Sequence, residues 1–201
     1  MTLSAPSRRA QVVRETRETA ISCTIDLDGS GVGQRQTGVP FLDHMLDQLA
    51  RHGGLDLDLR CRGDLEIDTH HSVEDCALVI GRAINEALGD RAGIARMGHA
   101  TVPMDEALAM AAIDLSGRAY AVVATGDAGG AGFPPSLLVH FMESVASEAR
   151  FCLHLSILAG RDPHHMAEAA FKSLARALSM AVAPDPRRKG GIGSTKGTLV
   201  G

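Results

Sequence analysis

A chain of 201 residues, 45% hydrophobic and 22% charged, has the composition of an ordinary globular protein and is long enough to bury a sizeable core. Its net charge of −4, with one Tyr and no Trp, disfavours nucleic-acid binding, which needs a basic face and stacking rings. No apolar run approaches the roughly 18 residues of a membrane span. The four cysteines stand singly, as in a reducing cytosol, so we expect a cytoplasmic protein that binds neither nucleic acid nor membrane.

The first half of the chain alternates between the periodicities of strand and helix. Alternating apolar residues over 21–27 predict a half-buried strand. Helical spacing follows over 40–53, with proline at its start and glycine at its end. A further strand is predicted over 55–61. A second helix, closed by glycine, is predicted over about 70–88.

The second half has a similar order of elements. Strands are predicted over 107–116 and 118–126, followed by a helix over about 135–150. A strand over 151–160 and a helix from 164 to about 182 complete it.

A cluster of polar side chains occurs in both halves at the same spacing. Each cluster reads His-His-x-x-Glu, and its residues are His70, His71 and Glu74, then His164, His165 and Glu168. A single histidine precedes each cluster, His44 by 26 residues and His140 by 24. This matched spacing indicates an internal duplication.

The duplication predicts an α+β fold of two repeated units, each a mixed β-sheet packed with two helices. We expect the units to be residues 1–93 and 94–201, which together form one compact domain. The last segment of the second unit, 184–201, is glycine-rich and basic. Its composition alone favours a disordered tail. Its hydroxyls, ammonium and backbone N–H groups also suit a phosphate, although the P-loop spacing is absent, and both interpretations stay open at this point.

The repeated clusters predict two metal sites. Consecutive helix residues point about 100° apart, so two adjacent histidines cannot readily bind one ion together. Each glutamate lies four residues after the first histidine and three after the second, so one His–Glu pair can bind one ion while the other histidine binds another. One such cluster alone is more often a capped, solvated helix start, but the repetition favours metal binding. The predicted ligands are His44, His70, His71, Glu74, His140, His164, His165 and Glu168.

A nitrogen-rich, sulfur-free set of this kind suits Mn, Fe, Co, Ni or Zn. Neither cluster has the HExxH or HxxEH spacing, which disfavours a zinc protease.

Five long motifs together resemble the imidazoleglycerol-phosphate dehydratases of histidine biosynthesis, and they occur in that family's order. The motifs lie at 37–57, 61–84, 103–120, 160–178 and 193–199, and the resemblance runs from about Arg8 onward. Ala119 and Gly193 depart from it, since we expect proline at both positions.

The resemblance implies a fold of the ribosomal protein S5 domain 2-like type and an enzyme of the hydro-lyase class. The implied reaction converts D-erythro-imidazole-glycerol phosphate to imidazole-acetol phosphate and water. The implied cofactors are two Mn²⁺ ions per active site. The implied partners are copies of the chain itself, as trimers assembled into an octahedral 24-mer with active sites at subunit interfaces.

The resemblance also implies roles for particular residues. Those expected to bind the substrate phosphate, or to lie near it, are Gln48, Arg96, Arg118, Lys172, Ser194 and Lys196. A dianion needs several cationic donors, which this set provides, although the arginines alone also suit surface salt bridges. The expected catalytic residues are Glu168, Glu18 and Glu74; only the resemblance singles out Glu18.

The expected mechanism passes through a metal-bound imidazolate and a diazafulvene-like intermediate, with a carboxylate or metal-bound water removing the carbon-bound proton. Two other classes stay open. A dinuclear phosphatase uses similar ligands but should contain more bridging aspartates and fewer histidines. A non-catalytic shell protein would use the clusters to join subunits and would not need Arg118 or Lys196.

Overall fold

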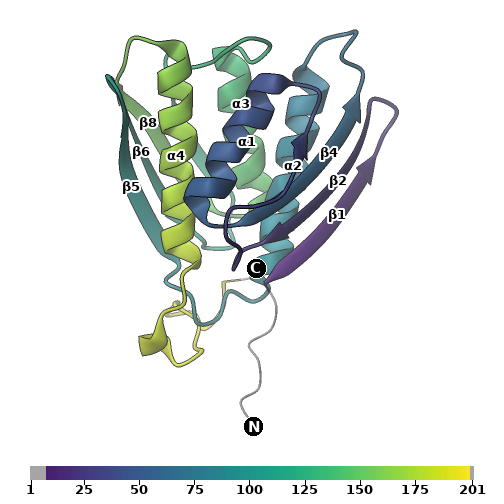
Figure 1. Cartoon of the computed structure of the whole chain (residues 1–201). Coiled ribbons are helices and arrows are strands. Elements are labelled where there is room, and N and C mark those ends of the chain that lie inside the picture. Colours follow the sequence, from purple (N-terminus) through teal and green to yellow (C-terminus); the bar gives the residue numbers. More distant parts are fainter. Residues whose placement is uncertain (1–7, 200–201) are drawn as a thin grey trace.

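The computed structural model describes residues 8–199, which form two β-sheets with four helices between them (Figure 1). The elements, in chain order, are β1 (Arg9–Glu15), β2 (Thr19–Asp26), β3 (Arg35–Gln36), α1 (Pro40–Gly53), β4 (Asp56–Gly63), α2 (His70–Leu88), β5 (Met97–Met104), β6 (Ala107–Asp114), β7 (Tyr120–Ala124), α3 (Pro135–Ala149), β8 (Cys152–Ala159), α4 (Pro163–Val182) and the short 3-10 helix η1 (Pro186–Arg188). None of the helices within this range is long and apolar enough to cross a membrane.

The two sheets have the same topology. The first has the order β1-β2-β4-β3 and the second has the order β5-β6-β8-β7. In each sheet the last pair is parallel and the others are antiparallel. The prediction of an α+β fold built from two repeated units, each a mixed sheet with two helices, is therefore confirmed.

The helices join the two units into one layer. Helix α2 packs on β1 and β2 of its own sheet, and α4 packs on β5 and β6 of the other. Helix α3 then packs against α2, and α1 against α4, so each of these contacts crosses from one unit to the other. A Cβ at Gly81 of α2 would lie 2.6 Å from the carbonyl oxygen of Val145 on α3, so only glycine permits this approach. A single buried hydrophobic cluster runs through both units.

The strands missing from the sequence prediction are β1, β3 and β5. Strand β1 buries only Val12, and β5 exposes Met97 and His99 and contains Pro103. Both lie at the edge of a sheet and bury a single residue each, so their sequences lack the clear apolar alternation of a half-buried strand. The third, β3, has only two residues. The other predicted strands and helices are present.

The C-terminal segment is folded against the body of the molecule as far as it is described, residues 184–199. Leu199 is 4% exposed. The Leu199 carbonyl oxygen lies so close to Gly117, which has a φ of 77°, that a Cβ there would be 1.6 Å from it. The backbone of Gly93 binds both Gly191 and Asp185. The interpretation as a disordered tail is therefore wrong for this range, because backbone contacts and an apolar anchor hold it in place.

Arg91, in the linker between the units, is almost completely buried, at 1% exposure. Its guanidinium donates to Asn85 Oδ1 at the end of α2 (2.6 Å) and to the carbonyl oxygens of Ala149 (2.9 Å) and Arg150 (3.1 Å) at the end of α3. Burial lowers the pKa of Arg91, and the nearby Arg150 lowers it further. This side chain therefore supplies hydrogen bonds to backbone carbonyl oxygens at the end of α3.

Replacing Arg91 with Met should destabilise the fold by roughly 2–4 kcal/mol, because buried acceptors lose their charged donor. The free energy of unfolding can be measured by urea denaturation at a fixed protein concentration. The matched control is Arg82→Met. The Arg82 side chain is 62% exposed and forms an ion pair with Glu86 one helical turn away, so its replacement should destabilise the fold by no more than about 0.5 kcal/mol. Equal effects of the two substitutions would contradict this role for Arg91.

Candidate functional site

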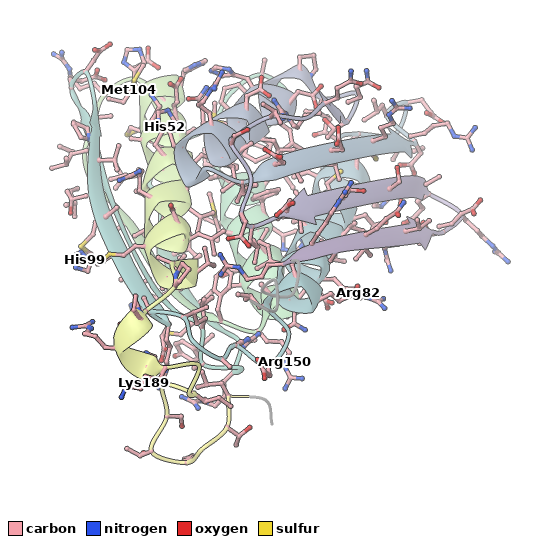
Figure 2. The ribbon with its side chains drawn as sticks, turned by 60° about the horizontal axis from the view of Figure 1, so that its bottom comes forward. His52, Arg82, His99, Met104, Arg150 and Lys189 are labelled. Atoms are coloured by element: carbon pink, nitrogen blue, oxygen red, sulfur yellow. The ribbon has the colours of Figure 1, made fainter. Side chains whose placement is uncertain are left out.

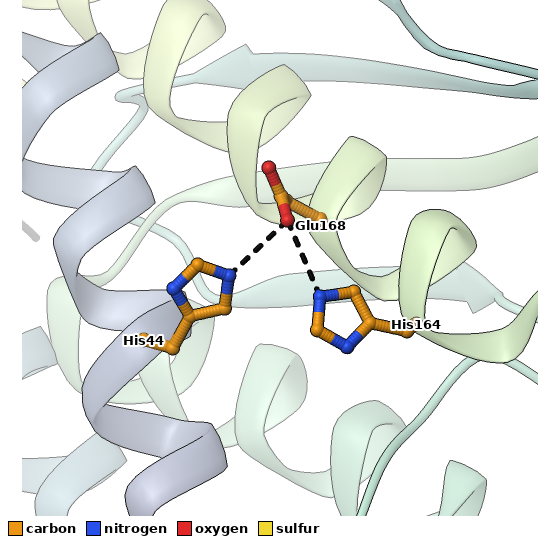
Figure 3. Close-up of side chains that lie close together, drawn as sticks. All are labelled: His44, His164 and Glu168. Atoms are coloured by element: carbon orange, nitrogen blue, oxygen red, sulfur yellow. Dashed lines mark hydrogen bonds and ion pairs between the residues drawn. The ribbon is translucent and has the colours of Figure 1, made fainter.

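The first candidate site consists of His44, His164 and Glu168, which we name the Glu168 cluster (Figure 3). The Nε2 atoms of His44 and His164 lie 3.2 Å and 3.4 Å from Oε2 of Glu168. Glu168 is buried, whereas His164 is exposed, so the cluster is open on one side.

The second candidate site consists of His70, Glu74 and His140, which we name the Glu74 cluster. The Nε2 atoms of His70 and His140 lie 3.4 Å and 3.3 Å from Oε2 of Glu74. The two imidazole rings stack with their centroids 5.2 Å apart. Its geometry therefore repeats that of the Glu168 cluster.

Each cluster takes residues from both units. His44 lies on α1 in the first unit but joins His164 and Glu168 on α4, because α1 packs against α4. His140 lies on α3 in the second unit but joins the cluster on α2. The lone histidine of each unit therefore completes the cluster of the other unit.

Helix geometry explains the pairing within each motif. The first histidine and the glutamate are four residues apart, so they lie on one face of the helix. Acidic residues fix the helix starts: Asp162 accepts from the backbone N–H of His164 (2.8 Å), and Asp68 from that of His70 (2.7 Å). The neighbouring histidines point elsewhere.

His71 and His165 lie outside both clusters. Their rings stand almost perpendicular to those of His70 and His164, at 87° and 89°. The Nδ1 of His71 lies 3.0 Å from Asp64. A carboxylate on Nδ1 fixes a histidine ring and leaves Nε2 available to a metal, as in many metalloproteins. Because the hydrogen bond with Asp64 favours the charged ring, it raises the pKa of His71.

His165 repeats this arrangement in the second unit. Its Nδ1 lies 2.9 Å from Glu106 Oε2, and this hydrogen bond is the main cause that lowers the pKa of Glu106 to about 2. The same hydrogen bond raises the pKa of His165. We name His71 and His165 the outward histidines. In each, a carboxylate on Nδ1 fixes the ring and leaves Nε2 on the other side of the ring.

Glu18 and Asp105 lie at equivalent places in the two units. Glu18 lies in the β1–β2 turn, with its carboxylate 3.9 Å from Nε2 of His71 and its side chain 55% exposed. Asp105 lies in the β5–β6 turn, with its carboxylate 3.9 Å from Nε2 of His165. Each turn therefore places a carboxylate beside the free nitrogen of an outward histidine.

The donors of the two clusters fit a divalent transition-metal ion. In each cluster the two ring nitrogens and one carboxylate oxygen lie within 4.8 Å of one another. His140 Nε2 is buried; Glu74 Oε2 lies 3.3 Å from it but outside hydrogen-bond geometry, and within the described part of the chain no other group hydrogen-bonds to it. A buried polar atom of this kind is costly unless a ligand satisfies it. Two imidazoles with one carboxylate are a set that Mn²⁺, Fe²⁺, Co²⁺ or Zn²⁺ accepts.

A separate cavity of about 600 Å³ lies between the C-terminal segment and the connections that lead into β5 and β7. Four of the residues expected to bind phosphate line it: Arg96, Arg118, Ser194 and Lys196. Arg188 also lines it and was not predicted. The prediction named Gln48 and Lys172 as well, but neither lines this cavity in the single chain.

The charges in the cavity are only partly balanced. Arg96 binds Asp114 through two hydrogen bonds of 2.7 and 2.9 Å and donates to the Gly193 carbonyl oxygen (2.6 Å). Arg118 and Lys196 have no ion-pair partner among residues 8–199. These two cations are therefore available to an anionic ligand.

Gly193, one of the two departures from the family pattern, lies under the guanidinium of Arg188. A Cβ at this position would be 2.6 Å from Nη1 of Arg188. Because glycine leaves room, Arg188 lies beside the loop. Nothing in the structure explains the other departure, Ala119.

The clusters and the cavity lie at opposite ends of α4. His164 is near the start of this helix, whereas the backbone N–H of Arg96 binds the Ala181 carbonyl oxygen near its end. In Figure 2, Met104 lies at the first of these ends and Lys189 of the C-terminal segment at the other. At 1.5 Å per residue, the helix separates the two by roughly 25 Å.

Gln48 and Lys172 lie toward the cluster end, each one helical turn from a cluster residue. Gln48 follows His44 on α1, and Lys172 follows Glu168 on α4. The Nζ atom of Lys172 is 2.6 Å from Glu168 Oε1. Burial alone would raise the pKa of Glu168, but the hydrogen bonds from Lys172 and His44 outweigh burial and lower it.

Sequence reasoning missed Asp64, Asp105, Glu106 and Arg188. The first three lie at strand ends beside a predicted histidine, but β5 was not predicted, so the turn that holds Asp105 and Glu106 was not visible. Because the two units are repeats, the position of Glu18 in the first unit could have indicated the equivalent residue of the second unit, Asp105.

A family model described as "Imidazoleglycerol-phosphate dehydratase" matches residues 37–178. The imidazoleglycerol-phosphate dehydratase of Cutibacterium acnes is 50% identical, and the match covers 96% of this chain and 98% of the relative. That of Frankia casuarinae is 53% identical, with 96% and 100% covered.

Solved structures of such enzymes share the fold. The imidazoleglycerol-phosphate dehydratase of Staphylococcus aureus superposes with a TM-score of 0.79 at 32% identity, covering 88% of this chain and 99% of the other. The Pyrococcus furiosus enzyme, solved in complex with (S)-C348, has a TM-score of 0.81 at 35% identity, with 93% and 99% covered. The chain therefore belongs to the imidazoleglycerol-phosphate dehydratase family and is a hydro-lyase.

Proposed function

We propose that the chain dehydrates D-erythro-imidazole-glycerol phosphate to imidazole-acetol phosphate and water, in a cation-dependent step of histidine biosynthesis. The observation that carries this proposal is the pair of His-His-Glu clusters together with a separate cationic cavity. A substrate with an imidazole at one end and a phosphate at the other needs both kinds of site. Membership of the family supports the same reaction.

We infer two Mn²⁺ ions as cofactors, one at the Glu168 cluster and one at the Glu74 cluster. Three donors of each cluster would hold the ion, which leaves positions for further ligands. When bound, such ions supply Lewis acidity toward the nitrogens of the substrate's imidazole ring. The residues around the ions must then position the ring and move protons.

The cationic cavity suits the phosphate. Arg118 and Lys196 have no competing carboxylate in the described chain, so a phosphate dianion can bind both. Arg96 is positioned by Asp114, and the hydroxyl of Ser194 adds a further donor. Binding here fixes the phosphate end without contacting the reacting carbons.

Proton transfer requires a carboxylate that can reach the substrate. The proton on the carbon that bears the neighbouring hydroxyl is removed, and the hydroxyl on the ring-attached carbon takes up a proton and leaves as water. The resulting enol then gains a proton at the ring-attached carbon and loses its hydroxyl proton, which gives the ketone. Glu18 suits these transfers because its side chain is exposed and its one ion-pair partner among residues 8–199 is His71. Glu168 and Glu74 are committed to histidines and are better suited to hold the cations.

The distance between clusters and cavity favours an active site built from more than one copy of the chain. The substrate spans at most about 10 Å from ring to phosphate, by the sum of its bond lengths. It cannot bridge the roughly 25 Å that separates the two sites along α4. We therefore propose that one subunit provides the clusters and another the phosphate cavity.

The outward histidines support the same assembly. The Nε2 atoms of His71 and His165 face away from their own clusters, and each ring is fixed by a carboxylate. We propose that they bind the cations of a neighbouring subunit. Closed symmetry then generates equivalent sites, as in the trimers and octahedral 24-mer that the family resemblance implies.

We place the enzyme in the cytoplasm. All four of its cysteines are free thiols, which is typical of a reducing compartment. Burial raises the pKa of Cys23 to about 12, so this thiol is inert. No cysteine is needed for the proposed chemistry.

Metal-stripped protein should form no acetol phosphate from imidazoleglycerol phosphate, and Mn²⁺ should restore its formation. Product can be followed by chromatography, with inorganic phosphate measured in the same samples. Release of inorganic phosphate in place of the acetol would indicate a phosphatase. Fully loaded protein that forms no product would leave only a role for the metals in joining subunits.

Replacing Lys196 with Ala should raise KM by roughly tenfold or more with a smaller change in kcat, because the lysine contacts only the non-reacting end of the substrate. The matched control is Lys189→Ala, an exposed lysine of the same segment that does not line the cavity. Its KM should stay at the wild-type value. An unchanged KM in Lys196→Ala would contradict the phosphate site.

Mixed assemblies test whether one active site combines several subunits. The double variant Arg118→Ala/Lys196→Ala lacks the phosphate site, and His44→Ala lacks the Glu168 cluster. When the two are co-expressed, sites that combine intact halves should regain activity that neither variant shows alone. His44→Ala with His164→Ala is the control, because both remove the same cluster. No recovery beyond that control would indicate a site within one subunit.

A further inference from the structure

The two clusters match in every donor but differ in the charge of one neighbouring residue. In α4, the position four residues after the cluster glutamate is Lys172, and the equivalent position in α2 is Leu78. Both positions lie one turn farther along the same helix face as the glutamate. Only the Glu168 cluster therefore has a lysine beside its carboxylate.

Lys172 is held firmly against Glu168. Its Nζ lies 2.6 Å from Oε1 of Glu168 and 3.3 Å from the sulfur of Met104 on β5. The side chains of Lys172 and Glu168 are 15% and 9% exposed, so water screens their charges only weakly. The sulfur is a weak acceptor and offers no counter-charge.

Glu74 has a different environment. Its side chain is 36% exposed, and the partners of its carboxylate within residues 8–199 are His70 and His140. No lysine or arginine of this range forms an ion pair with it. With its histidines neutral, the Glu74 cluster therefore carries one negative charge, whereas the Glu168 cluster together with Lys172 carries none.

The acidic groups around the clusters match and do not offset this difference. Each first histidine has a carboxylate on its backbone N–H, and each outward histidine has one carboxylate on Nδ1 and one 3.9 Å from Nε2. The matched pairs are Asp68 and Asp162, Asp64 and Glu106, and Glu18 and Asp105. Among these groups the lysine is therefore the charge without a counterpart in the other unit.

We propose that the two cation sites are unequal: the Glu74 cluster binds a divalent cation more tightly than the Glu168 cluster, and Lys172 causes the difference. This inference rests on the proposed function, which assigns one cation to each cluster. A fixed ammonium beside Glu168 repels a divalent ion and competes for the carboxylate's electron density. The expected difference in dissociation constant is about ten- to a hundredfold.

The sites then fill in order. At low cation activity the Glu74 cluster is occupied and the Glu168 cluster is empty. The second cation enters only at higher activity and exchanges faster, because a weaker site releases its ion sooner. Lys172 is therefore a positioning residue for the weaker site.

Titration of the metal-free, full-length protein with Mn²⁺ tests this directly, with binding followed by calorimetry or by the electron-spin signal of free Mn²⁺. Wild-type protein should show two classes of site, each of one ion per chain. His140→Ala should remove the tight class, and His44→Ala should remove the weak class. A single class in the wild type, or the opposite assignment, would overturn the proposal.

Two reciprocal substitutions test the cause. Lys172→Met should lower the dissociation constant of the weaker site toward that of the tighter site. Lys172→Arg keeps the charge and should preserve the difference between the two dissociation constants. Leu78→Lys, at a partly buried position, should weaken the tight class by about ten- to a hundredfold, with Leu78→Met as its neutral control.

An unchanged ratio of the two dissociation constants in Lys172→Met would refute the proposal. If that variant does not fold, an unchanged dissociation constant of the tighter site in Leu78→Lys would refute it. All of these are binding measurements, so they are independent of turnover. Equal sites in an active dehydratase would refute only this inference. Unequal sites in a protein without dehydratase activity would refute only the proposed function.

Discussion

The contact that the rest of the site depends on is the packing of each unit's first helix against the other unit's second helix. Helix α1 brings His44 to α4, and α3 brings His140 to α2. Without this crossing, each motif would present only one histidine and one glutamate to an ion. Small residues at the contact, such as Gly81, allow the helices to approach closely. Core packing and the proposed metal binding therefore depend on the same helix contacts.

The same layer of helices also separates the two parts of the candidate site, the clusters and the cationic cavity. The clusters lie near the start of α4, and the cationic cavity lies near its end. The cavity needs Arg118 and Lys196 without carboxylate partners, whereas the clusters need carboxylates. Cluster carboxylates placed beside these two cations in the same chain would pair with them and leave them unavailable to a phosphate. The length of α4 keeps the cluster carboxylates and the cavity cations apart within one chain.

Much of the fold and of the site followed from the sequence. The helices were predictable because α1 and α2 combine an apolar stripe with clear end signals, such as Pro40 and Gly89. The repeated spacing indicated the two clusters. Edge strands were not predictable, because β1 and β5 each bury a single residue and so give only a weak apolar pattern. The exchange of His44 and His140 between units was not predictable either, because it depends on how helices pack and not on their order along the chain.

The exchange of histidines between units has a consequence for the origin of the fold. Two separate half-length chains, paired about a two-fold axis, would each donate their single histidine to the other's helix and build two identical clusters by one rule. A shared ancestor of this kind needs no change in packing to become the present chain: joining its copies through a linker suffices. In a joined chain the two halves can differ, as they do where one carries Lys172 and the other carries Leu78 at the equivalent position.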